Sequence, residues 1–379
     1  MFSDDSVHIT NILPKEERKK NGIYFTPFEG VKFVCDTIEG IKKTYNRILE
    51  PSAGSGEFVN YLLQKFPTSE VVALEKNDTI IQNISYNCIH TDFIKYDVNE
   101  KFDLIIGNPP YYTIPKKNIP SVYNKYYAGR PNIYILFIIK SIKMLNEGGV
   151  LAFIVPKNFT NCTYYDLLRK AIYRFYNIII KNMDVNFMGT EQNVILLIVQ
   201  KTRDCADDYV LNIGPYTIFT AEKNILQDLL VGHTTLREIG ANIYVGTVVW
   251  NQVKHLLTNN PEDTLLIYSS DIKNGVLEPV EYKNVDKKNY ITLEGKNKPI
   301  LVLNRGYGSG AYSFNYCIIN HHNYLIENHL ICIECEDPET LDIILRSFKD
   351  SRTAEFIKYY FCTNTINISE LYDVLPIYI

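Results

Sequence analysis

Long apolar runs are absent from this chain of 379 residues. No uninterrupted apolar stretch approaches the roughly 18–20 residues that a membrane-spanning helix needs. The beginning of the sequence also lacks the apolar core of a secretory signal peptide. These absences predict an intracellular, cytoplasmic protein that does not associate with a membrane.

The sequence also lacks a regular cysteine pattern and an excess of positive charge. The eight cysteines lack the spacing of a disulfide framework, which predicts reduced thiols. Cys332 and Cys335 form a C-x-x-C pair, but no second pair accompanies it and its surroundings alternate like a strand, so we expect no metal. The net charge of −4 excludes a uniformly basic surface for nucleic acid but permits a local basic patch.

The chain does contain enough apolar residues, 46% of the total, to bury substantial cores, and its length suits two or three domains. From about residue 22 to 200, β-like apolar runs alternate with helical stretches, which predicts an α/β fold with a parallel sheet. A helix beginning near residue 134 is expected to end at Gly148 and Gly149. We expect strands at residues 47–51, 71–77, 102–108, 150–156, 177–185 and 194–201, with the last two antiparallel at an edge.

An acidic, polar linker at residues 202–209 marks a change in composition. Beyond it, the apolar runs become irregular and β-rich, with one helical stretch at residues 338–349. We therefore predict two domains, residues 1–204 and residues 205–379, of which the second is a β-rich α+β domain.

A glycine-rich loop follows the first expected strand in the stretch LEPSAGSGEF, residues 49–58. Gly54 and Gly56 let a ligand approach the backbone, and the N–H groups at the start of the next helix favour a negative ligand group. No G-K-[ST] follows at P-loop spacing, and the G-x-G-x-x-G fingerprint is incomplete. Alone, the loop is equally compatible with a tight turn between a strand and a helix.

Acidic residues after the next strands strengthen the case for a ligand. Glu75 ends the second strand, where doubly wound sheets place an acid against ribose hydroxyls. Asp92 and Phe93 suit an adenine, whose amine can donate to the acid while its face stacks on the ring. Each acid alone is also compatible with a solvated loop. Because the carboxyl ends of the strands share one edge of the sheet, the set predicts an adenosine-bearing cofactor.

The stretch DLIIGNPPYY, residues 103–112, carries the most specific pattern. Two successive prolines cannot continue a helix or a central strand, so Asn108 and the aromatic residues flank a rigid corner. Together with LEPSAGSGEF, this stretch resembles the motifs of S-adenosylmethionine-dependent N6-adenine DNA methyltransferases. NGIYFTP, residues 21–27, is similar to the motif that precedes the cofactor loop in their γ class, the TaqI-like arrangement. GGVLAFIVPKNF and ISELYDVLPIY resemble further family stretches.

This resemblance implies a Rossmann-like methyltransferase sheet with helices on both faces, followed by a target-recognition domain. It also implies methyl transfer from S-adenosylmethionine to N6 of an adenine flipped out of double-stranded DNA. The Asn108 side-chain oxygen and the Pro109 carbonyl would accept hydrogen bonds from the amine, while Pro110 would hold that carbonyl rigidly. Tyr111 would stack on the extruded base.

The resemblance further implies binding residues for the cofactor and the DNA. Phe187 would pack on the flipped base, with a core position as the alternative. The residues implied in cofactor binding are Tyr24, Thr26, Pro27, Pro51, Ala53, Gly54, Gly56, Glu75, Asp92, Phe93 and Asn108.

Local groups of cations are candidate DNA contacts. Lys116 and Lys117 follow the Asn-Pro-Pro-Tyr tetrapeptide and are expected near phosphates. Residues 282–312 hold six cations against two anions, and Arg305 and Ser309 lie there in a glycine-rich loop. A solvated lysine face is the open alternative for that segment. For Trp250, a core position is favoured over a wedge between bases.

Other functions remain open from the sequence. The same tetrapeptide occurs in methyltransferases that act on an RNA adenine or a protein glutamine amide. Enzymes that methylate N4 of cytosine usually carry Ser in place of Asn108. A DNA-binding module without catalysis would not require the intact tetrapeptide. We expect a monomer, and whether a cognate restriction endonuclease accompanies it stays open.

Overall fold

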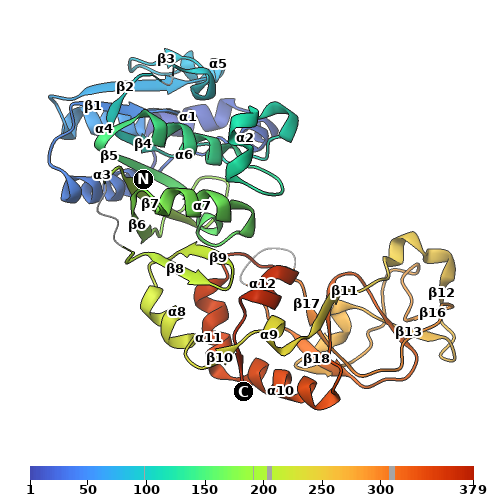
Figure 1. Cartoon of the computed structure of the whole chain (residues 1–379). Coiled ribbons are helices and arrows are strands. Elements are labelled where there is room, and N and C mark those ends of the chain that lie inside the picture. The colour runs from blue at the N-terminus through green and yellow to red at the C-terminus, as the bar shows by residue number, and fades with distance from the viewer. Residues whose placement is uncertain (98, 191, 203–206, 307–311) are drawn as a thin grey trace. The chain divides into compact units, whose positions relative to one another are not determined.

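The computed structural model describes residues 1–97, 99–190, 192–202, 207–306 and 312–379 (Figure 1). The chain forms two compact units. The first comprises Met1–Asn212 and Tyr216–Lys223, and the second comprises Ile213–Pro215 and Asn224–Ile379. Composition had placed a boundary at residues 204/205, whereas in the structure a short segment beyond the linker still packs with the first unit.

The first unit is built around a seven-stranded sheet in the order β3-β2-β1-β4-β5-β7-β6. Strands β1 to β5 run parallel, β7 pairs antiparallel with β5, and β6 pairs antiparallel with β7. These pairings confirm the predicted α/β sheet and its antiparallel edge. The strands are β1 (Arg47–Glu50), β2 (Glu70–Glu75), β3 (Ile89–His90), β4 (Phe102–Gly107), β5 (Leu145–Pro156), β6 (Asn177–Asn182) and β7 (Val194–Gln200).

Helices cover both faces of this sheet, as predicted (Figure 1). Successive strand residues point to opposite faces, so Ile48 packs with α3 and α4 while Leu49 packs with α6 and α7. Burial on both faces explains why the strands are continuous apolar runs in the sequence. The helices of this unit are α1 (Asp4–Ile12), α2 (Lys15–Asn21), α3 (Phe28–Ile41), α4 (Glu57–Lys65), α5 (Asp78–Ile81), α6 (Ile133–Met144) and α7 (Asp166–Tyr173).

The expected end of the helix at a glycine pair is wrong. Helix α6 ends at Met144, and strand β5 begins at the next residue, so Gly148 and Gly149 lie inside the strand. The register between β4 and β5 shifts there, between Phe102 and Leu104. A Cβ atom on Gly149 would lie 3.2 Å from the Phe102 carbonyl oxygen, so the glycine permits the irregular pairing. The glycines therefore serve a bulge and not a helix cap.

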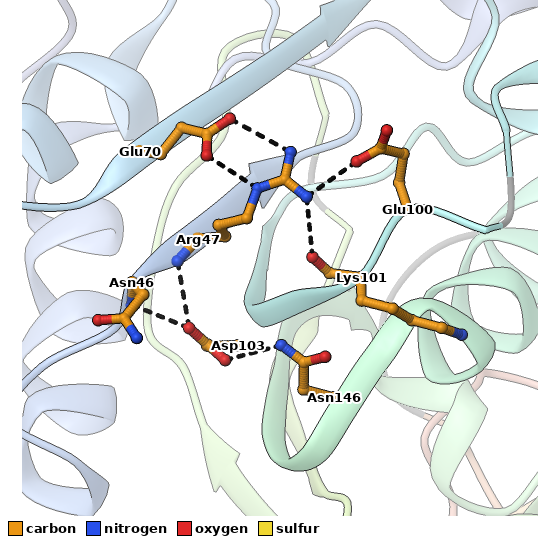
Figure 2. A network of polar contacts seen from close by, with 7 residues as sticks. All are labelled: Asn46, Arg47, Glu70, Glu100, Lys101, Asp103 and Asn146. Carbon is orange, nitrogen blue, oxygen red and sulfur yellow. Dashed lines mark hydrogen bonds and ion pairs between the residues drawn. The ribbon is translucent and has the colours of Figure 1, made fainter.

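A polar network ties four parallel strands together at the amino edge of the sheet (Figure 2). The Arg47 guanidinium donates to both oxygens of Glu70, at 2.8 and 3.2 Å, and to Glu100 at 2.8 Å. Asp103 accepts hydrogen bonds from two backbone amides and from Asn146. Burial alone would raise the pKa of Asp103, but these hydrogen bonds outweigh it and lower the pKa.

We expect Arg47→Met to reduce the free energy of unfolding by about 1–2 kcal/mol. The value is modest because the Arg47 side chain is 35% exposed, and solvent screens its ion pairs. Chemical denaturation monitored by circular dichroism measures the change. Arg174→Met is the control, because Arg174 is exposed and makes no ion pair with any described residue. Equal losses for both variants would contradict a stabilising network.

The second unit contains two four-stranded sheets, in the orders β11-β20-β17-β18 and β12-β16-β13-β19. Its helix α10 (Pro338–Lys349) begins as the sequence predicts, with the Asp337 side chain capping the first turn. The strands are β11 (Asn242–Val245), β12 (Leu257–Thr258), β13 (Thr264–Ile267), β16 (Tyr290–Ile291), β17 (Ile300–Asn304), β18 (Tyr316–Ile319), β19 (Tyr324–Ile326) and β20 (Leu330–Glu334). The unit is thus β-rich with mixed α+β structure.

Shorter elements complete the described chain, and none of its helices has the length and apolar character needed to cross a membrane. The remaining strands are β8 (Val210–Ile213), β9 (Tyr216–Phe219), β10 (His233–Thr234), β14 (Ile272–Lys273), β15 (Val276–Leu277) and β21 (Ile377–Tyr378). The remaining helices are α8 (Lys223–Leu229), α9 (Leu236–Ile239), α11 (Ser351–Tyr360) and α12 (Ile368–Asp373).

Candidate active site

A pocket opens at the carboxyl edge of the sheet in the first unit. The segment before α3, the loops after β1 and β2, and the end of β4 contribute its walls. Of the residues expected to bind the cofactor or act in catalysis, those lining it are Tyr24, Thr26, Pro51, Ala53, Gly54, Glu75, Phe93, Asn108 and Pro110.

The glycine loop after β1 is held in a left-handed turn. Gly54 has a φ of +57° and Gly56 a φ of +92°, values that favour glycine. A Cβ atom on Gly56 would lie 2.4 Å from the ring of Tyr86. The Tyr86 hydroxyl donates to the Gly54 carbonyl at 2.7 Å. Gly56 therefore does not line the pocket but lets Tyr86 support the loop, a role that the sequence did not reveal.

Glu75 joins the glycine loop to the end of β2. One carboxylate oxygen accepts from the Gly54 amide at 3.0 Å, and the other accepts from the Lys76 and Asn77 amides at 2.8 Å each. Burial raises the pKa of Glu75, and the three backbone hydrogen bonds oppose that rise. The acid that the sequence places at the end of this strand therefore lies in the pocket wall in a fixed orientation.

The Asn108 side chain is fixed through both ends of its amide. Its nitrogen donates to the Tyr24 carbonyl and to the Thr26 hydroxyl, at 3.2 Å each. Its oxygen accepts from the Tyr111 hydroxyl at 2.5 Å. A Cβ atom on Gly22 would lie 2.5 Å from the Tyr111 backbone nitrogen, so this glycine allows the NGIYFTP segment to pack on the tetrapeptide. The two motifs thus form one structural piece.

Tyr111 is more enclosed than an open stacking platform. Its hydroxyl lies 2.8 Å from the Ile154 carbonyl oxygen as well as against Asn108, and its ring meets Tyr134 edge to face with centroids 5.8 Å apart. Burial raises its pKa, so the hydroxyl keeps its hydrogen at neutral pH. The hydroxyl therefore has one hydrogen and two possible acceptors, and it can donate to only one of them at a time.

Glu50 is a pocket residue that the sequence reading missed. It ends β1 in a buried position, and one carboxylate oxygen accepts from the Ser52 amide at 3.0 Å. The other oxygen, Oε2, has no hydrogen-bond partner. Burial raises the pKa of Glu50 well above its ordinary value. A Cβ atom on Gly107 would lie 2.2 Å from the Glu50 carboxylate, so the glycine before Asn108 makes room for this acid.

The turn that carries Asp92 and Phe93 rests on a buried lysine. Lys140 of α6 donates to the carbonyl oxygens of Phe93, Ile94 and Tyr96, at 2.6, 3.0 and 2.5 Å. Burial lowers the pKa of this lysine. Phe93 and Phe137 line the pocket with ring centroids 4.8 Å apart, whereas Asp92 caps the turn through the Ile94 amide and does not line it. Lys140 was also missed from sequence.

Several expected residues lie away from the pocket wall. Pro27 and Pro109 are buried beside it without lining it. Phe187 is buried in the hydrophobic cluster that includes Val34 and Ile154, so the structure places it in the core and not at the pocket. Trp250 is partly buried against a cluster of the second unit.

The expected DNA contacts have different surroundings. Lys116 and Lys117 are exposed on a short 3₁₀ turn, Lys116–Asn118. Arg305 is exposed in the second unit, after β17, and its backbone pairs with His329 and Ile366. Ser309 lies outside the described residues.

Three of the six cations in residues 282–312 have partners within the second unit. The Lys287 ammonium lies 3.8 Å from the ring centroid of Tyr282 and 4.0 Å from that of Tyr268. Lys288 donates to the Leu257 carbonyl at 3.4 Å, and Lys296 pairs with Glu334 at 2.9 Å. These contacts favour a structural role for the three lysines over a free phosphate-binding face. Within the described ranges, no group of three His, Cys, Asp or Glu residues is arranged to hold a metal ion.

Comparison with known proteins finds several methyltransferases to which this chain is similar. Residues 45–188 match the model of the Eco57I restriction-modification methylase family. The chain is 32% identical over 379 residues to the type II methyltransferase M.CvrRI of Paramecium bursaria Chlorella virus XZ-6E, covering 94% of each chain. It is 27% identical over 365 residues to modification methylase CviBIII of Paramecium bursaria Chlorella virus NC1A, covering 91% of this chain and 90% of the other. A putative class I S-adenosylmethionine-dependent methyltransferase from Listeria monocytogenes aligns with a TM-score of 0.41 and 21% identity, over 48% of this chain and 62% of that one.

Proposed function

Because the chain belongs to the type II methyltransferases of restriction–modification type, we propose that it methylates N6 of an adenine within a short motif of double-stranded DNA. S-adenosylmethionine is the proposed methyl donor. The observation that carries the proposal is the fixed amide of Asn108 at the rim of the pocket. Its order after the glycine loop supports the γ class.

The pocket offers groups that match the chemistry of S-adenosylmethionine. The unpartnered oxygen of the buried Glu50 suits a cation, and the cofactor carries an α-ammonium group. Glu75 ends β2, where an acid reaches ribose hydroxyls in doubly wound sheets. The rings of Phe93 and Phe137 provide apolar surface for an adenine. When bound, the cofactor supplies an electrophilic methyl group on a sulfonium.

The tetrapeptide would then act on the adenine amine. That nitrogen is a weak nucleophile, because its lone pair is delocalised into the ring. Hydrogen bonds from the amine to the Asn108 oxygen and the Pro109 carbonyl favour the pyramidal, more nucleophilic form as positive charge develops. The nitrogen gains the methyl group as the carbon–sulfur bond breaks, and one amine proton is released to water. In-line positioning supplies much of the acceleration.

The Tyr111 hydroxyl holds the acceptor oxygen of Asn108 before the base arrives. If its hydrogen turns toward the Ile154 carbonyl, which is 2.8 Å away, the Asn108 oxygen is released for the amine. The Tyr111 ring would then stack on the extruded base and replace part of the stacking lost from the duplex.

The second unit is the proposed target-recognition domain, since sequence must be read from base edges in the grooves. Arg305 is the described residue there that we propose for DNA contact, because it is exposed. Lys116 and Lys117 are proposed to contact phosphates of the target strand. We also propose that the protein acts as a monomer, independently of whether a cognate endonuclease is present.

The test is incubation of unmethylated plasmid DNA with the protein and S-adenosylmethionine, followed by nucleoside mass spectrometry and single-molecule sequencing. We expect N6-methyladenine at one short motif. N4-methylcytosine would overturn the choice of base. Methylation of an RNA or a protein glutamine, with the DNA unmodified, would overturn the substrate.

Variants at Tyr111 separate the hydroxyl from the ring. We expect Tyr111→Phe to slow single-turnover methylation by about 2- to 10-fold, a loss that corresponds to the free energy of one hydrogen bond. Tyr111→Ala is expected to cost about 10²-fold, because loss of base stacking is added to a cavity. The fluorescence of 2-aminopurine at the target position reports base extrusion and should fall only for alanine. Equal losses of rate for the two variants would contradict a role for the ring.

A further inference from the structure

The segment that follows the tetrapeptide has an unusual charge. Residues 112–132 contain Lys116, Lys117, Lys125 and Arg130 and no Asp or Glu, in a chain whose net charge is −4. All four cationic side chains are exposed, and none forms an ion pair with a described residue. We call this segment the basic loop. Its charge is therefore not offset by its own residues or by ion pairs.

The basic loop is a built structure with a closed neck. Thr113 and Asn132 form an antiparallel bridge, and the Ile114 amide donates to the Pro131 carbonyl at 3.0 Å. The Ile133 amide donates to the Tyr112 carbonyl at 2.9 Å. These contacts bring the two ends of the loop together, at the junction between β4 and α6.

Apolar side chains anchor the middle of the basic loop. Ile114, Ile119, Tyr123 and Tyr127 are each less than 10% exposed and belong to the core cluster of the α6 and α7 face. Because these residues alternate with the exposed cations, burial of one set fixes the other set on the surface. The cations thus stand on a packed support, which limits the side-chain and backbone entropy lost when they bind a ligand.

The basic loop begins at the rim of the candidate active site. Its first residue, Tyr112, accepts a hydrogen bond from the pocket residue Lys76 at 2.9 Å. The preceding Pro110 also lines the pocket. A base held against Asn108 keeps its own backbone phosphates nearby, since a strand carries one phosphate about every 3.4 Å along the duplex axis.

We propose that the basic loop is a phosphate clamp, in which Lys116, Lys117, Lys125 and Arg130 bind the target-strand backbone on either side of the extruded base. This inference rests on the proposed function and extends it from two lysines to one folded surface. The clamp would bind without regard to sequence, since phosphates carry no base identity. It would hold the strand in place while the base leaves the duplex.

The test compares two charge-matched variants of the full chain. The loop variant replaces Lys116, Lys117, Lys125 and Arg130 with Gln. The control variant replaces Lys32, Lys42, Lys43 and Lys101 with Gln. These four lysines are also exposed, but they lie outside the basic loop, in α3, directly after it and directly before β4. Duplex DNA affinity is measured with S-adenosylhomocysteine from 50 to 300 mM salt.

The salt dependence gives the decisive result. Each phosphate contact contributes about 0.9 to the slope of log affinity against log salt, so we expect the loop variant to lose about 2–4 in slope. The control should keep the wild-type slope. The affinity of the loop variant should fall by the same factor for target and unrelated duplexes. Its affinity for S-adenosylhomocysteine should stay unchanged, which shows that the pocket is intact. An unchanged slope, or the same loss in the control, would overturn the clamp.

Once the methylated adenine has been mapped, uncharged methylphosphonates in place of the phosphates beside it show where the basic loop contacts the DNA. These replacements should weaken DNA binding by the wild type and have little further effect on the loop variant. If the losses of affinity from the methylphosphonates and from the loop variant are additive, the clamp does not contact these phosphates. Failure of the wild type to methylate DNA would instead overturn the proposed function, so the two failures are distinguishable.

Discussion

Asn108→Ala is expected to lower the single-turnover rate of methylation by about 10²–10³-fold. The loss corresponds to removal of one preorganised hydrogen-bonding group from an active site. It should appear in the rate at saturating DNA and cofactor, because the amide acts on the developing positive charge more than on binding. Quench-flow measurement with tritiated S-adenosylmethionine and a duplex containing the mapped motif gives this rate directly.

The same substitution has a structural cost that must be measured separately. It removes the partner of the Tyr24 carbonyl and the Thr26 hydroxyl, whereas the Tyr111 hydroxyl retains the Ile154 carbonyl. We therefore expect a loss of about 1–2 kcal/mol in unfolding free energy and a small decrease in affinity for S-adenosylhomocysteine. Asn60→Ala, on the exposed side of α4, is the control. A rate within tenfold of wild type would refute the role of the Asn108 amide.

The parts of the fold that the sequence predicted are those that local pattern and burial determine together. Strands β4 and β7 are apolar over most of their length because both faces of the sheet are covered, and such runs permit few other structures. The prediction failed at Gly148 and Gly149, where glycine is favoured both after a helix and in a bulge. Only the register of β5 against β4 decides between those alternatives.

The candidate site was predicted unevenly for a similar reason. Glu75 ends one strand and Asn108 follows another, and the carboxyl ends of these strands share one edge of the sheet, so chain order alone placed the two residues together. Lys140 lies in IYILFIIKSIKM, where a lysine directly after seven apolar or aromatic residues was itself a signal of a buried cation with partners. Its acceptors are three carbonyls more than 40 residues earlier, and no local pattern names them. Phe187 shows the reverse case, since an aromatic residue in a loop suits a core and a site equally.

Glu50→Gln is expected to have opposite effects on stability and on cofactor affinity. An acid whose pKa is raised by folding prefers its neutral form in the folded protein. As pH rises above the ordinary value of 4.5 toward the raised pKa, ionisation therefore costs the unbound protein stability. The glutamine variant avoids this cost and should unfold at a higher temperature than wild type at neutral pH. Differential scanning calorimetry without ligand measures that difference.

Cofactor binding should favour wild type over Glu50→Gln, the opposite of the order expected for stability without ligand. An ammonium group beside the unpartnered oxygen of Glu50 stabilises the carboxylate, so wild-type affinity for S-adenosylhomocysteine should increase with pH through the raised pKa and then level off. Glu50→Gln should bind about 10- to 100-fold more weakly above that pKa, with little pH dependence over the same range. Glu147→Gln removes an 82% exposed carboxylate of the same unit and should match wild type in both respects. Isothermal titration calorimetry across pH measures these affinities. If Glu50→Gln binds as tightly as wild type at every pH, the Glu50 carboxylate does not contact the ammonium group. If Glu50→Gln instead unfolds at a lower temperature than wild type without ligand, the buried acid is already satisfied within the protein.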